Sequence, residues 1–129
     1  MSVGVWDPGG QASEDRSVPV ELLNRFAALE VEVTEDAIRQ AGLENERWVM
    51  DQEAKAWDAA AELDNATLAH LARVFTRIEM LVPGWDAGKK SPVIPLVRLL
   101  KDRDAFEPEL RKWIKTNTNN RYLPYGSAL

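Results

Sequence analysis

The segment Gly84-Trp-Asp-Ala-Gly-Lys-Lys-Ser91 comes closest to a motif with known chemistry. A P-loop needs the spacing G-x-x-x-x-G-K-[ST] between a strand and a helix, so that backbone N–H groups surround the phosphates. Here the glycines are one residue too close, a second lysine intervenes, and the preceding segment is predicted to be helical. We therefore expect no nucleotide hydrolysis. Lys89 and Lys90, just before a helix start at Ser91, form either an anion site or a solvated basic turn.

Groups suited to catalysis or metal binding are scarce. The chain has no cysteine, which excludes disulfides, thiolate metal sites and cysteine nucleophiles, and its one histidine, His70, is expected on an exposed helix face. Asp51, Asp58 and Glu62 share part of a predicted helix face, but such a face ordinarily meets water rather than a metal. We therefore expect no enzymatic activity, no cofactor and no metal.

Charge is divided along the chain. The net charge is −5, yet most Asp and Glu residues lie in residues 1–64 and most Lys and Arg residues in 65–129. Such a division is typical either of two halves that complement each other inside one molecule or of a surface for a charged partner. If the acidic half is a binding surface, it is expected to contact a basic partner. If the acidic half of one copy pairs with the basic half of another, the protein is expected to form a homo-oligomer.

The basic half has features of a nucleic-acid-binding surface. Arg111, Lys112, Lys115 and Arg121 could neutralise phosphates, and the nearby aromatic rings could stack on bases. Predicted helices over 95–103 and 108–115 have helix-turn-helix proportions. However, acidic residues occupy the start of the second helix, which a recognition helix presents to DNA, and the overall pI is about 4.9.

Aromatic residues outside the predicted helices suggest contact surfaces. Trp6 lies in the N-terminal segment, Trp85 in a loop, and Tyr122 and Tyr125 in the C-terminal segment. Each could pack on its own domain or anchor a partner, as tryptophan, tyrosine and arginine often do. The candidate partner-binding residues are therefore Trp6, Trp85, Lys89, Lys90, Arg111, Lys112, Lys115, Arg121, Tyr122 and Tyr125.

Apolar spacing and capping residues predict the elements that position these groups. A first helix begins near Ser17 with Pro19 in its first turn, and a second is capped by Thr34, stopped by Gly42 and buries Ile38 and Ala41. Further helices are expected over 44–63, from Asp64 or Asn65 to Leu81, from Pro95 to 103, and from 107–108 onward.

These elements predict an all-α fold: a compact, antiparallel, bundle-like single domain of five to six helices. Residues 1–16 are expected to be a flexible N-terminal arm, 17–120 the helical domain, and 121–129 an extended aromatic tail. No apolar run is long enough to cross a membrane and no secretory signal is recognisable, so a cytoplasmic location is expected.

Taken together, these features favour a non-enzymatic protein-binding adaptor or regulator that acts through protein–protein contact. The alternative is a nucleic-acid-binding regulator that uses the basic C-terminal half.

Overall fold

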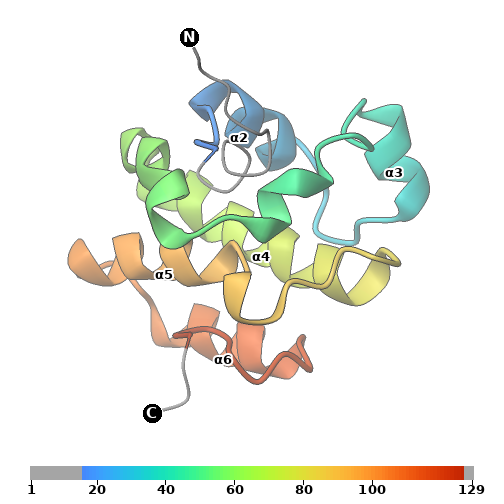
Figure 1. Ribbon diagram of the computed structural model, residues 1–129. Helices are drawn as coiled ribbons and strands as arrows, with labels where there is room; N and C mark the ends of the chain where they lie inside the picture. Colours follow the sequence, from blue (N-terminus) through green and yellow to red (C-terminus); the bar gives the residue numbers. More distant parts are fainter. Residues whose placement is uncertain (1–15, 127–129) are drawn as a thin grey trace, which may run out of the picture.

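The computed structural model describes residues 16–126 and is built from helices joined by short loops (Figure 1). No strand is present within this range, which confirms the expected all-α, bundle-like fold. The elements are α2 (Val20–Ala27), α3 (Glu35–Gln40), η1 (Arg47–Asp51), η2 (Ala54–Glu62), α4 (Asn65–Leu81), η3 (Gly88–Lys90), α5 (Val93–Asp102) and α6 (Pro108–Thr116).

Helix α4 is the centre of the core. It begins and ends where its sequence predicts. Its start is set by Asp64, whose side chain accepts a hydrogen bond from the Thr67 N–H at 2.8 Å and caps the first turn. Its apolar face, which includes Leu71 and Phe75, is fully buried. Helices α2, α5 and α6 all pack against α4, which runs through the middle of the molecule (Figure 1).

The expected single helix over 44–63 is wrong. The structure instead has two consecutive 3₁₀ helices, η1 and η2, separated at Gln52 and Glu53. The Gln52 side chain is 5% exposed, donates to the Trp48 carbonyl at 3.0 Å and accepts from the Arg16 N–H at 3.1 Å. A buried amide needs such partners, and satisfying them holds Gln52 in a break between the two elements.

Helix α3 ends as its sequence predicts. Gly42 has a φ of +74°, the Leu43 N–H bonds to the Ile38 carbonyl, and the Gly42 N–H bonds to the Arg39 carbonyl. These bonds form a Schellman motif, in which Leu43 and Ile38 also pack together as buried apolar residues. Ala41 is exposed, however, so its expected inward orientation is wrong.

Helix α5 begins at Val93, two residues before the expected start at Pro95. Pro95 therefore lies in the first helical turn, where backbone N–H groups have no carbonyl partner within the helix, so the N–H that proline lacks costs no helical hydrogen bond. Helix α6 starts at Pro108 as predicted and buries Leu110 and Ile114. It packs on α4, whereas no extensive α5–α6 interface is present.

The C-terminal segment folds back onto the domain. Residues 121–126, expected to be extended, form successive turns in which Leu123 is buried and the Tyr125 ring meets Phe106 edge-on at 6.0 Å. The expected arm, 1–16, lies outside the described residues except for Arg16, whose guanidinium stacks 3.7 Å from the Trp48 ring. No helix in residues 16–126 is long and apolar enough to span a membrane.

Candidate binding surface

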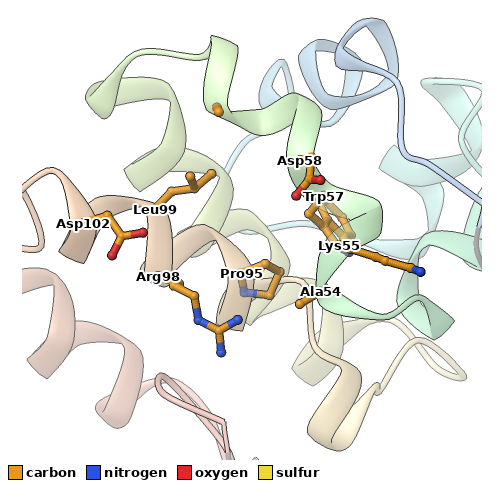
Figure 2. A pocket seen from close by; sticks show the side chains of 9 residues that line it. Ala54, Lys55, Trp57, Asp58, Pro95, Arg98, Leu99 and Asp102 are labelled. Atoms are coloured by element: carbon orange, nitrogen blue, oxygen red, sulfur yellow. The ribbon is translucent and has the colours of Figure 1, made fainter.

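A groove of about 620 Å³ lies between η2 and α5 (Figure 2). Apolar side chains form its floor, and charged side chains of both signs form its edges. The floor contains Ala54, Trp57, Ala61, Pro95 and Leu99, and the edges contain Lys55, Asp58, Arg98 and Asp102. This combination of an apolar floor and charged edges suits an amphipathic ligand.

The two walls of the groove run in parallel. Ala54 at the start of η2 shares a hollow with Pro95 at the start of α5. At the other end, the Arg103 guanidinium donates to the Ala61 carbonyl at 2.7 Å and to the Leu63 carbonyl at 2.8 Å. These contacts fix the spacing of η2 and α5, and therefore the width of the groove.

The 3₁₀ geometry of η2 decides which side chains face the groove. In a 3₁₀ helix, side chains three residues apart lie directly above one another. Lys55, Asp58 and Ala61 therefore form one row along the groove, beside the buried Trp57. In an α-helix this row would drift around the axis, so the unexpected 3₁₀ conformation shapes this surface.

Two smaller hollows continue the groove past Arg98. One, of about 190 Å³, is lined by Lys89, Lys90, Arg98 and Tyr125 among others. The other, of about 310 Å³, also contains Arg98 and Tyr125. The structure thus brings three of the predicted candidates, Lys89, Lys90 and Tyr125, to one end of the groove.

Lys90 and Tyr125 are held in place at this end. The Lys90 ammonium lies 3.6 Å from the Glu53 carboxylate and donates to the Asp51 carbonyl at 3.2 Å. The Tyr125 ring is 46% exposed and carries the Lys101 ammonium 4.6 Å from its centre. Arg98, which lines the same hollow, is exposed and forms no ion pair with any residue of the described chain, so its guanidinium is available to a ligand.

A buried polar network supports the basic turn. The Glu79 carboxylate accepts hydrogen bonds from the Ser91 hydroxyl, from the Asn120 amide at 3.1 Å and from the Ala87 N–H at 3.4 Å. Burial raises the pKa of the Glu79 carboxyl, although these three hydrogen bonds oppose the shift. The network joins α4, η3 and the C-terminal turns, so it fixes the position of Gly88–Lys90.

Arg121 and Tyr122 lie beside this network, around a hollow of about 220 Å³. The Arg121 guanidinium donates to the Tyr122 hydroxyl at 3.2 Å. This hydrogen bond lowers the pKa of the Tyr122 phenol, and the charge of Lys89 contributes a smaller effect in the same direction. The pair forms a basic, polar surface separate from the apolar floor of the groove.

The other candidate residues do not join the groove. Arg111, Lys112 and Lys115 are exposed on α6 and line none of the four hollows described above. Trp6 lies outside the described residues. Trp85, expected to be available to a partner, is only 7% exposed and meets the Phe26 ring edge-on at 6.3 Å, so that expectation is wrong.

The two unlike halves of the chain meet within the molecule. Arg77 pairs with Glu32 at 3.2 Å, and Lys90 pairs with Glu53 at 3.6 Å. Each pair joins an acid from the first half to a cation from the second. Part of the charge division therefore serves internal contacts, as one interpretation of the sequence predicts.

Sequence reasoning missed Arg98, Trp57 and Asp102 as surface features. The only signal for Arg98 was its position as the one charged residue in the apolar run Val93–Leu100. Trp57 is 2% exposed and belongs to the core, yet it also lines the groove floor. Its role in this surface depends on α5, which is distant in sequence.

Residues 16–126 contain no group of three or more His, Asp or Glu side chains placed to hold a metal ion. No protein-family model matches the chain, no curated protein matches it, and no solved structure matches its fold. The groove and its surroundings are therefore the basis for a functional proposal.

Proposed function

We propose that the protein is a non-enzymatic adaptor or regulator that binds a segment of a partner protein in the groove between η2 and α5. The observation that carries this proposal is the groove itself, with an apolar floor, charged edges and an exposed Arg98 that has no ion pair in the described chain. Arginine and tryptophan are the residues most enriched where binding energy concentrates in protein interfaces.

The dimensions of the surface favour a chain segment over a compact small molecule. A volume of about 620 Å³ is within the range of roughly 300–1,000 Å³ for small-ligand pockets. However, the groove continues into two further hollows that share Arg98, so the available surface is elongated. A peptide segment can place successive side chains along such a path.

Affinity capture from the native cell extract tests this proposal, with nuclease-treated and untreated samples in parallel. Ala61→Tyr fills the groove at an exposed position and should abolish capture of the partner. Lys112→Glu changes a charge on α6 outside the groove and should preserve it. A partner captured equally by both variants would refute the groove as its binding site.

A second candidate function is nucleic-acid binding through α6. Its support is the exposure of Arg111, Lys112 and Lys115, none of which forms an ion pair with a described residue. Binding of this kind would weaken steeply with salt and with the double charge reversal Arg111→Glu and Lys112→Glu. Absence of binding to duplex and single-stranded DNA and RNA at low salt would eliminate it.

We place this activity in the cytoplasm. The absence of cysteine from the sequence suits a reducing compartment.

A further inference from the structure

The charges along the groove are not mixed evenly. The end formed by Ala54 and Pro95 adjoins the hollow that contains Lys89, Lys90 and Arg98. Toward the other end, where Arg103 bonds to Ala61, the charged edge residues are Asp58 and Asp102. Figure 2 shows Arg98, Leu99 and Asp102 projecting from the same stretch of α5. Among the charged side chains that line the groove itself, Arg98 therefore lies toward one end, called the basic end below, and Asp58 and Asp102 lie toward the other, called the acidic end.

These charges are available to a ligand. Three of the edge residues, Arg98, Asp58 and Asp102, are exposed and form no ion pair with any residue of the described chain. Carboxylates and guanidinium groups pair in planar, two-bond geometry, which gives directional recognition. A ligand that offers the opposite charges in the right order would gain orientation and a faster encounter.

The apolar floor lies between the two charged ends. Trp57 and Leu99 supply its largest side chains. The Trp57 Nε1 is buried and has no hydrogen-bond acceptor within the described residues. Because this nitrogen is buried beneath the surface, it is out of reach of a ligand in the groove, and the floor offers a ligand apolar contact.

We infer that the groove binds a partner-protein segment in which an apolar side chain is flanked by a carboxylate on one side and by a cation on the other. The carboxylate pairs with Arg98 at the basic end, the apolar side chain covers Trp57 and Leu99, and the cation meets Asp58 and Asp102. This inference rests on the proposed function and specifies the chemistry of the segment that the groove accepts.

Selection from a displayed library of random dodecapeptides tests the inference with the full-length protein. Peptides enriched on the wild type should carry an acidic and a basic residue on opposite sides of an apolar residue. Arg98→Glu reverses the charge beside the apolar floor at the basic end, so the acidic residue of the enriched peptides should be lost or replaced by a basic one. Asp102→Lys reverses one of the two charges at the acidic end, so acidic residues should increase where the cation was. The α6 variant Lys112→Glu should enrich the same peptides as the wild type.

The affinities of single peptides for the wild type and for Arg98→Glu test the inference more directly. A peptide enriched on the wild type should lose about tenfold or more in affinity for Arg98→Glu at low salt, since an attraction is replaced by a like-charge repulsion. Replacing the acidic residue of that peptide with lysine should restore binding to the variant. Isothermal titration calorimetry with both peptides and both proteins gives the four affinities required.

The outcomes separate this inference from the proposed function. Enriched peptides that lack the two charges, or that are unaffected by Arg98→Glu, would overturn the inference. If Ala61→Tyr nevertheless abolishes their binding, the groove still binds chain segments and the proposed function stands. If no peptide is enriched on the wild type, the inference is overturned. If Ala61→Tyr binds the enriched peptides as well as the wild type does, both the inference and the proposed function are contradicted.

Discussion

The Arg103 guanidinium donates a hydrogen bond to the Ala61 carbonyl at 2.7 Å, and so joins the last turn of η2 to the end of α5. The same guanidinium donates to the Leu63 carbonyl at 2.8 Å and to the Asn65 side-chain oxygen at 3.0 Å. One side chain thus satisfies acceptors at the end of η2 and at the start of α4. The groove walls depend on this contact for their spacing.

Arg103→Met should lower the free energy of unfolding by about 1–2 kcal/mol, because it removes several charge-assisted hydrogen bonds while keeping most of the aliphatic stem. The matched change Arg111→Met affects an exposed side chain without an ion pair in the described chain, and should alter stability by less than about 0.5 kcal/mol. Urea unfolding of both variants measures the difference. Equal effects would mean that Arg103 does not hold η2 and α5 together.

Glu79 should make the stability of the protein depend on pH. Burial raises the pKa of this carboxyl above its ordinary value of 4.5, so the folded protein holds the proton more tightly than the unfolded chain. The contribution of the group to stability is therefore complete below pH 4.5 and is lost as the pH rises through the raised folded value. Glu79→Gln removes this titration. The free energy of unfolding of the variant, compared with that of the wild type, should therefore be higher at pH 7 than at pH 4.

Urea unfolding of the wild type and Glu79→Gln at both pH values checks this sign. The glutamine side chain retains an oxygen that can accept from Asn120 and Ala87, so the network around Gly88–Lys90 should persist. A stability difference that is the same at both pH values would show that the Glu79 carboxyl is not shifted by burial.

Asp104 ends α5 in a conformation that favours glycine. Its φ is 58°, and the Ala105 N–H bonds to the Leu100 carbonyl at 2.8 Å in a Schellman motif. Asp104→Gly should stabilise the protein by about 0.5–1 kcal/mol, because glycine has no Cβ to clash in the left-handed region. Asp102→Gly, two residues earlier in the helix, should be destabilising instead. Thermal unfolding of the two variants distinguishes them by the sign of the change.

The internal ion pairs predict a monomer. Arg77 with Glu32 and Lys90 with Glu53 join the two unlike halves of the chain inside one molecule. Analytical ultracentrifugation should therefore give a single species of 14.5 kDa at both low and moderate salt. A dimer that dissociates as salt increases would instead support pairing of unlike halves between copies.

The sequence predicted the elements whose boundaries are set locally. Thr34 caps α3 by accepting from the Ala37 N–H at 3.0 Å, Asp64 caps α4, and Pro108 begins α6, all at the expected positions. Caps and apolar spacing act over a single helical turn, so they are visible in the residues themselves.

Features that depend on distant partners were not predictable in this way. The break at Gln52 depends on hydrogen bonds that include the Arg16 N–H, 36 residues away. Trp85 is buried because its loop folds onto Phe26 of α2. The groove likewise requires η2 and α5 to lie side by side, and no local pattern in either segment encodes that arrangement.

The most direct test of the proposed function is to map the binding site of the captured partner on the ¹⁵N-labelled protein by NMR. The backbone amides that shift on titration should cluster in Ala54–Glu62 of η2 and Val93–Asp102 of α5, and Ala61→Tyr should eliminate the shifts. Shifts confined to Arg111, Lys112 and Lys115 on α6, with the groove unaffected, would contradict the proposal and favour a site on the basic helix.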